Sequence, residues 1–271
     1  KFKITKINRK SIFFFKKKGY LLIKNVFNKK DFFEIRKTIL EVSKKFTNSK
    51  TNYKSVEDIF FHKHLIKLRK NPKKFALFFD TLQTSASLIN FWTNKKIISI
   101  IERIMQCEKE FISATDMLLR IDSPIDDRNK LDWHQDSSYF KQNNSGYNGL
   151  NCWAPLTKLK FEMGPLEFLE NSHKLGCIKV KKIRKGKFGS LQRKIPEKIT
   201  NKFKIKKYEM KPGDILFLNM DTLHRSGTNI SNFFRMTSIC RYHNAKSKDF
   251  NPGLNIYRYS DKAINKEVHG F

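Results

Sequence analysis

The chain has 271 residues, of which 39% are hydrophobic and 25 are Phe, so it can build the core of one large domain. Its formal charge of +31 raises nucleic acid, an anionic membrane surface or an acidic substrate as partners. Lysine is spread evenly among Asn, Ile and Phe, however, which favours the compositional drift of an AT-rich genome. We therefore expect no specific nucleic-acid partner.

The apolar runs and the cysteine spacing argue against a membrane-spanning protein and against a small disulfide-stabilised protein. No apolar run approaches the ~20 residues that cross a bilayer, and the run at 12–15 is too short for a signal peptide. The cysteines form no CxxC pair and no scaffold spacing; they are Cys107, Cys152, Cys177 and Cys240. Free thiols indicate a reducing compartment, so we expect a cytoplasmic protein.

The first third of the chain is predicted to be helical after one short strand. Residues 19–23 form an apolar run typical of a buried strand. Apolar residues then recur at three-and-four spacing from Phe32 to Phe46, and Asn28 with Asp31 predicts the cap of this helix. An amphipathic helix therefore follows the strand.

Further helical patterns cover residues 56–69, 74–92 and 95–105, and the last is capped by Thr93 or Asn94. His62 and His64 stand two apart on the first of these helices and so lie on different faces. We expect both imidazoles to be solvated.

After Cys107 the pattern changes to that of strands, which are predicted at 111–121, 150–156, 166–169, 204–210, 215–219 and 234–242. Turn residues between them indicate an antiparallel sandwich or barrel. The Lys-rich stretch at 177–204 has little periodicity and is expected to be a surface loop and a candidate lid. The prediction is one α+β domain over residues 1–271, with a helical part at about 28–106 and a mainly β core at about 110–244.

The segment Trp133-His134-Gln135-Asp136 carries the clearest chemistry. Residues two apart in a strand point to the same side, so His134 and Asp136 can grip one ion. A third ligand must come from another strand, and His224 fits that role. Two histidines and one carboxylate form the facial triad of non-heme Fe(II) oxygenases, which leaves coordination positions open. The sequence therefore predicts an Fe(II) site.

Several motifs in this order resemble the phytanoyl-CoA dioxygenase family over roughly residues 15–243. They are His134-Gln135-Asp136, Gly164-Pro165-Leu166-Glu167-Phe168, Asn171-Ser172-His173, Gly213-Asp214, His224, Ser226-Gly227 and Arg235. The resemblance implies a double-stranded β-helix, a cupin-like jelly roll, buttressed by the N-terminal helices. It also implies Fe(II) as the metal and 2-oxoglutarate as the cosubstrate.

Arg235, eleven residues after His224, is the natural planar partner for the distal carboxylate of 2-oxoglutarate. Thr237 stands on the same strand face and could add a hydroxyl hydrogen bond. By resemblance, the cosubstrate pocket is also lined by Ser226, Trp153 and Met117. Gln135 points away from the metal in this interpretation, where it either helps to hold the turn or lines the substrate side, and His173 belongs to a structural turn.

The resemblance implies a dioxygenase that hydroxylates a C–H bond and releases succinate and CO2. Related halogenases have a small residue where the carboxylate ligand stands, whereas Asp136 is present here, so hydroxylation is expected. The substrate is a small molecule or a thioester-carried group, and the family allows acyl thioesters, amino acid derivatives, sugars and natural products.

Two alternatives remain open at this point. An AlkB-like nucleic-acid demethylase also uses iron and 2-oxoglutarate, and Arg235 with Arg241 reproduces that family's pair of arginines six apart. Against it stand the short interval from His224 to Arg235 and the Gly164-Pro165-Leu166 segment. The second alternative is a non-catalytic binding module, which would have no need of an intact triad together with Arg235.

Overall fold

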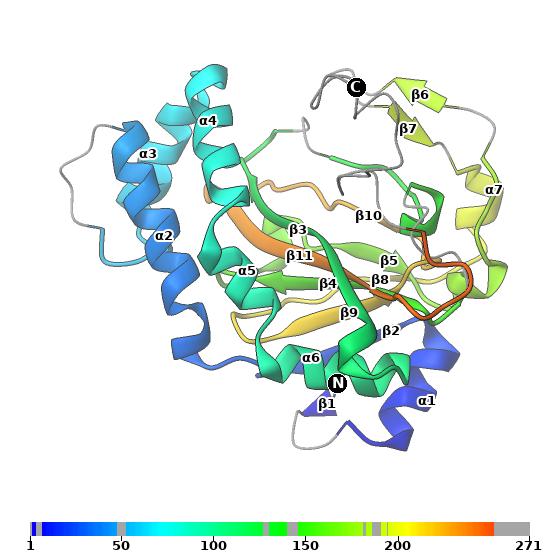
Figure 1. Cartoon of the computed structure of the whole chain (residues 1–271). Helices are drawn as coiled ribbons and strands as arrows, with labels where there is room; N and C mark the ends of the chain where they lie inside the picture. Colours follow the sequence, from blue (N-terminus) through cyan, green and yellow to red (C-terminus); the bar gives the residue numbers. More distant parts are fainter. Residues whose placement is uncertain are drawn as a thin grey trace, which may run out of the picture.

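Helices from the first half of the chain cover one face of a sheet in the computed structural model (Figure 1). The structure describes residues 2–3, 7–47, 53–126, 130–139, 146–180, 183–185, 191–193 and 195–251. The helices are α1 (Arg9–Lys18), α2 (Lys29–Thr47), α3 (Ile59–Arg69), α4 (Pro72–Gln83), α5 (Ala86–Trp92), α6 (Lys95–Met105) and the short α7 (Glu197–Thr200).

The predicted start of α2 is confirmed by a reciprocal cap. The Asn28 side chain accepts a hydrogen bond from the backbone N–H of Lys30 at 3.0 Å, and Asp31 accepts one from the backbone N–H of Asn28 at 2.6 Å. Asn94 likewise caps α6 by accepting from Lys96. Polar side chains placed directly before an apolar pattern therefore fix where these helices begin.

Two features of the helical half differ from the sequence prediction. The pattern at 74–92 predicts one helix, but the structure has two, because Ser85 caps α5 and interrupts the path from α4. Helix α1 was not predicted at all. It ends at Gly19, which has a φ of +79° and at which a Cβ atom would collide with the ring of His173.

The strands form two principal sheets. The larger has the order β1-β2-β9-β4-β11-β3 and is antiparallel except for β1 with β2. Its strands are β1 (Phe2–Lys3), β2 (Tyr20–Lys24), β9 (Ile215–Asn219), β4 (Gly149–Pro155), β11 (Arg235–Asn244) and β3 (Ile112–Asp122). The smaller sheet contains β10 (His224–Arg225), β5 (Glu167–Leu169) and β8 (Ile205–Lys206).

Most predicted strands are confirmed with bounds that move by one or two residues. The predicted strand at 204–210 is mostly irregular: only β8 is regular, and Met210 makes an isolated bridge to Leu159. The expected loop at 177–204 contains the hairpin β6 (Ile183–Lys185) and β7 (Leu191–Arg193), and then α7. Residues 181–182, 186–190 and 194 of this candidate lid lie outside the described residues.

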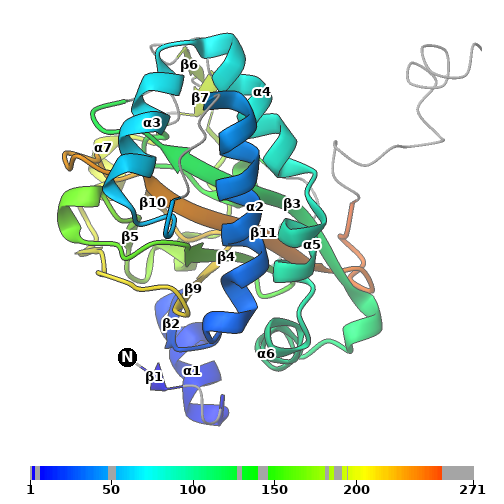
Figure 2. The same ribbon diagram turned by 90° about the vertical axis from the view of Figure 1, so that its left-hand side faces the viewer.

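The two faces of the larger sheet bury different clusters. One cluster lies between that sheet and the helices, where Phe78 and Trp92 pack with Cys240 and Tyr242. Figure 2 shows α2 and α4 in front of β3 and β11 from this side. The second cluster includes Trp153, Leu216 and Ile239 of the larger sheet and Phe168 of the smaller one. Side chains that alternate along β4 and β11 therefore point either to the helices or to the space between the sheets.

His62 corrects the expectation of a solvated residue. It is 2% exposed, and its Nδ1 atom accepts a hydrogen bond of 3.0 Å from the backbone N–H of Phe234. Burial lowers the pKa of His62 to about 4, so the buried imidazole is neutral.

Among the residues that the structure describes, none of the helices combines the length and the apolar character that crossing a bilayer requires.

Candidate metal centre

His134 and His224 are held side by side by the backbone. The N–H of each residue donates to the carbonyl of the other, at 3.0 and 2.9 Å, as in an antiparallel pair. The two rings are 4.2 Å apart between centroids, and both side chains are buried. The main chain therefore brings two distant parts of the sequence to one point.

Both imidazoles present the same nitrogen to the centre. The Nδ1 atoms of His134 and His224 lie 2.7 and 2.9 Å from the backbone oxygens of Asp132 and Thr222. A carbonyl can only accept, so each Nδ1 must donate, and in a neutral imidazole the Nε2 atom then carries a lone pair. Burial and the neighbouring His224 lower the pKa of His134 to about 3, which keeps that ring neutral.

Asp136 completes the group from the 3-10 turn at Asp136–Ser138. Its Oδ1 atom lies 3.8 Å from the Nε2 of His134 and 3.7 Å from the Nε2 of His224. Its side chain is buried, which opposes ionisation, but the guanidinium of Arg241 outweighs burial, and the pKa of Asp136 is lowered to about 2. The carboxylate is therefore ionised.

These three side chains fit a divalent metal ion. One ligand atom from each lies within 4.8 Å of the others, and no other such group of His, Cys, Asp or Glu occurs among the described residues. Two neutral nitrogens with one carboxylate oxygen are the donors of a facial triad, and backbone carbonyls fix both rings in the ligating tautomer. The predicted ligands His134, Asp136 and His224 are thus brought together.

Arg235 is also buried, and 5% of its surface is exposed. Its Nε and Nη2 atoms donate to one oxygen of Asp122, at 3.1 and 2.9 Å. Its Nη1 atom donates to the backbone oxygens of Gly164 and Gly227. A Cβ atom on either glycine would collide with the backbone of the opposite segment, so the close approach of these two loops requires glycine at both positions.

The carboxylate of Asp122, beside Arg235, is shared with a second arginine. Arg120 also pairs with Asp122, at 3.1 Å, so two guanidinium groups share one carboxylate. Thr237 lies opposite Arg120 in the strand register, and its buried hydroxyl has no hydrogen-bond partner among the described residues. A buried guanidinium needs an anion, and Asp122 is the anion that pairs with Arg235 in this structure.

The model of the phytanoyl-CoA dioxygenase (PhyH) family matches residues 15–237. The chain belongs to the phytanoyl-CoA dioxygenase family. At the level of sequence, no curated protein matches it.

Solved structures of low sequence identity share the fold of this family member. The epimerase SnoN, in complex with Fe3+, α-ketoglutarate and nogalamycin RO, superposes with a TM-score of 0.60 at 13% identity, over 90% of this chain and 85% of SnoN. EvdO2 from Micromonospora carbonacea var. aurantiaca, complexed with 2-oxoglutarate, gives 0.58 at 15% identity, over 92% and 96%. EctD from S. alaskensis, with 2-oxoglutarate and 5-hydroxyectoine, gives 0.59 at 14%, over 91% and 82%.

The other predicted cosubstrate residues of this phytanoyl-CoA dioxygenase family chain lie in different places. Trp153 belongs to the cluster between the sheets, and Ser226 is buried against Leu131 beside the glycine loops. Met117 packs instead against the core that faces the helices, next to a register shift in β3, so the structure does not bring it together with the other two.

The side chain of Gln135, which lies between His134 and Asp136 in the sequence, is held by three hydrogen bonds to the backbone. Its Nε2 atom donates to the backbone oxygens of Gly176 and Asp221, both at 2.7 Å, and its Oε1 atom accepts from the backbone N–H of Ile178. His173 lies in the turn Ser172–Leu175, with Nε2 2.9 Å from the Lys16 oxygen. The contacts of Gln135 favour a role in holding the turn, and those of His173 are consistent with a structural turn.

Two residues that contact the carboxylate of Asp136 were not predicted as part of the site from the sequence. Asn151 donates to Asp136 at 2.6 Å, and Arg241 donates to it from Nε at 3.1 Å. A signal was available for each. Asn151 is a polar residue inside an apolar strand, and Arg241 stands an even number of residues after Arg235, on the same face of β11.

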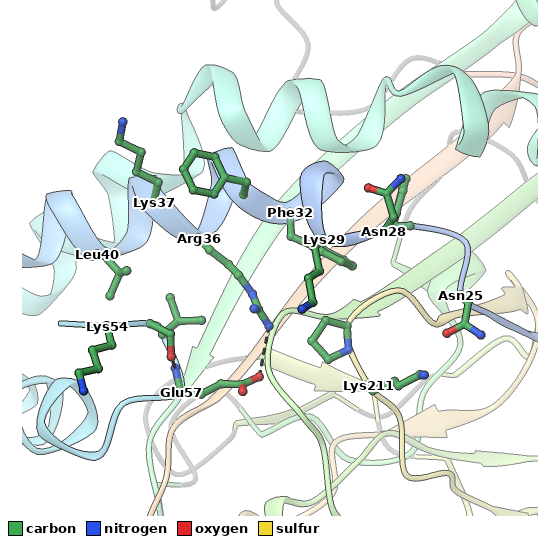
Figure 3. A pocket seen from close by; sticks show the side chains of 15 residues that line it. Asn25, Asn28, Lys29, Phe32, Arg36, Lys37, Leu40, Lys54, Glu57 and Lys211 are labelled. Atoms are coloured by element: carbon green, nitrogen blue, oxygen red, sulfur yellow. Dashed lines mark hydrogen bonds and ion pairs between the residues drawn. The ribbon is translucent and has the colours of Figure 1, made fainter.

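A groove with a cavity volume of about 830 Å³ lies apart from this centre, between α2, residues 54–57 and Pro212. Figure 3 shows Arg36 reaching across it to Glu57, at 3.2 Å, with Phe32 beside it. None of its lining residues belongs to the metal centre or to the Arg235 cluster. The groove is therefore separate from the three candidate metal ligands.

Proposed function

We propose that this protein is an Fe(II)- and 2-oxoglutarate-dependent oxygenase that hydroxylates a C–H bond of a small-molecule or thioester-carried substrate. The observation that carries the proposal is the buried triad, in which Nε2 of His134 and Nε2 of His224 face the Oδ1 atom of Asp136. Iron bound there would supply the redox chemistry that couples dioxygen to decarboxylation of 2-oxoglutarate, which zinc cannot do. Succinate and CO2 are the expected coproducts.

Arg235 and Thr237 are proposed to hold the distal carboxylate of 2-oxoglutarate. The buried guanidinium of Arg235 can attract an anionic group in addition to Asp122, and the Thr237 hydroxyl, which has no partner among the described residues, can donate to that group. Asp122 and the two glycine carbonyls would hold the guanidinium in one orientation, which limits the entropy lost when the cosubstrate binds. Ser226 and Trp153 would line the same space.

We further infer that the two principal sheets form the double-stranded β-helix that the family resemblance implies. The support is the direct pairing of residue 134 with β10 of the smaller sheet, together with the contacts of Asp136 to β4 and β11 of the larger one. The metal would then lie between the sheets, where both contribute to its surroundings.

Hydroxylation is favoured because the carboxylate ligand is present. A halogenase needs an extra metal position for its halide, and Asp136 fills that position. The similar structures include an epimerase, SnoN. Structural similarity therefore does not decide between hydroxylation and another outcome of C–H activation, and hydroxylation is proposed here from Asp136. The demethylase alternative is disfavoured, because the family model that matches the chain is that of the phytanoyl-CoA dioxygenases.

A metabolite screen with labelled dioxygen tests this proposal. Protein loaded anaerobically with Fe(II) would be given 2-oxoglutarate and pools of acyl thioesters, amino acid derivatives, sugars or natural products, and succinate would be measured. The active pool should yield a product with one oxygen from the labelled gas, unaffected by chloride. Oxygen derived only from water, a chlorinated product or an epimer without added oxygen would contradict hydroxylation.

A further inference from the structure

The two oxygens of Asp136 have different surroundings. Oδ1 faces the Nε2 atoms of His134 and His224, and it also receives a long contact of 3.3 Å from Nη2 of Arg241. Oδ2 is turned the other way. It accepts a hydrogen bond of 2.6 Å from Nδ2 of Asn151 and one of 3.1 Å from Nε of Arg241. One oxygen is therefore directed to the metal position while the other is held by donors.

The donors come from neighbouring strands of the larger sheet. Asn151 of β4 and Arg241 of β11 are partners in the strand register, so their side chains stand next to each other on one face. They are 3% and 7% exposed, and Asp136 is 1% exposed. A buried ion pair adds little to stability by itself, because desolvation offsets the attraction, so a role in the site is a better explanation of this pair.

We propose that Asn151 and Arg241 are positioning residues that make Asp136 a ligand through Oδ1 alone. A carboxylate can bind a metal with one oxygen or with both. Three single-atom protein ligands leave three of six octahedral positions, which a chelating keto acid and dioxygen need together. If Oδ2 also bound the metal, one of these positions would be lost. The inference rests on the proposed function, and it identifies how the site keeps that position open.

The inference predicts a particular pattern in variants that free Oδ2. Asn151→Ala and Arg241→Met should still bind Fe(II) in a 1:1 ratio, because the three ligands remain. The open position should be impaired, and we expect affinity for a diatomic gas to fall by roughly 10-fold to 100-fold, an effect as large as the one that loss of a ligand-orienting residue has on metal affinity or activity. A purely structural role would predict loss of folding and iron together.

Nitric oxide is a suitable probe, because it binds Fe(II) where dioxygen would and gives a paramagnetic product. The intact protein would be loaded anaerobically with Fe(II) and 2-oxoglutarate and titrated with nitric oxide, with electron paramagnetic resonance as the readout. Asn219→Ala is the matched control: Asn219 is a buried asparagine of β9 whose side chain bonds to the Gly146 oxygen and not to Asp136. This variant should bind nitric oxide as the wild type does.

Arg241→Lys separates orientation from charge, since lysine retains the charge but not the paired N–H groups. We expect it to remain impaired, and recovery of wild-type nitric oxide binding would overturn the positioning role of Arg241. If Arg241→Met does not fold, the smaller change Asn151→Ser decides the question. Wild-type affinity in folded variants that hold iron refutes this inference alone. Failure of the wild-type protein to bind iron and 2-oxoglutarate refutes the proposed function instead.

Discussion

His134 and His224 exchange two main-chain hydrogen bonds, of 3.0 and 2.9 Å, so their positions do not depend on their side chains. Replacement of either imidazole should therefore remove a metal ligand and leave this pairing intact. We predict that His134→Ala and His224→Ala lose bound Fe(II) and keep the wild-type circular dichroism spectrum. Iron content after anaerobic loading and desalting is the measurement, and His173→Ala serves as the control histidine. Full iron occupancy in either ligand variant would remove that residue from the triad.

Arg235 should control affinity for 2-oxoglutarate more than affinity for iron. Loss of a buried charge-assisted contact costs on the order of 2 to 5 kcal/mol, so Arg235→Ala should weaken 2-oxoglutarate roughly 30-fold or more. Iron occupancy should be unchanged. Calorimetric titration of the metal-loaded protein measures the effect, and wild-type affinity would show that Arg235 serves only to pair with Asp122.

Thr237→Val tests the unpartnered hydroxyl with little change in shape. If Thr237 donates to the cosubstrate, the variant should bind 2-oxoglutarate about 3-fold to 10-fold more weakly, as expected for one hydrogen bond. Thr157→Val is the matched control, because the Thr157 hydroxyl is also buried without a partner among the described residues but lies outside the site. Equal effects of the two changes would argue against a specific role of Thr237.

The glycine pair that approaches Arg235 should be sensitive to a single methyl group. At Gly227 a Cβ atom would collide with the backbone oxygen of Pro165, so Gly227→Ala should lower the free energy of unfolding by about 1 to 3 kcal/mol. It should also weaken 2-oxoglutarate, because the shifted carbonyl holds Arg235. Gly146→Ala is the control: its φ of +48° makes alanine unfavourable, but no atom lies within 4 Å of the added Cβ. Stability should fall there without a change in cosubstrate affinity.

His62 should make the fold sensitive to acid. Its pKa falls from the ordinary 6.5 to about 4 on folding, so between these values the unfolded chain binds a proton that the folded protein does not. The free energy of unfolding therefore decreases as the pH falls from about 6.5 to 4, by roughly 1.4 kcal/mol per pH unit from this residue. We expect His62→Gln to be less stable at pH 7 but to lose less stability between pH 7 and 5. The free energy of unfolding would be measured by urea titration at both pH values. An equal decrease in the wild type and the variant between pH 7 and 5 would contradict this account.

Local patterns in the sequence predicted most elements because they act over short distances. The cap at Asn28 and the apolar spacing after it specify α2, and turn residues mark the strands of the β core. The same patterns could not separate α4 from α5. The apolar pattern continues past Ser85, and one serine within it is a weak signal of a helix boundary in the sequence. His62 was misjudged since its burial depends on Phe234, which lies far away in the sequence.

The grouping of the three candidate ligands was predictable because their residue types and order are restrictive, but the surroundings of these side chains were not. The pairing of Arg235 with Asp122, and of Arg241 with Asp136, depends on the registers of β3, β4 and β11. A strand sequence defines which face a side chain occupies and leaves open which partner it meets. The packing of Met117 against the helices likewise follows the register shift in β3.

The most direct test of the central claim is the anaerobic addition of 2-oxoglutarate to the Fe(II)-loaded protein, followed by visible absorbance. A keto acid chelated to Fe(II) gives a metal-to-ligand charge-transfer band, and this measurement needs no substrate. We predict a band that saturates at one equivalent in the wild-type protein and is absent in His224→Ala at the same iron concentration. Absence of the band in the wild type, or a band of equal intensity in the variant, would contradict assignment of the metal and cosubstrate to this site.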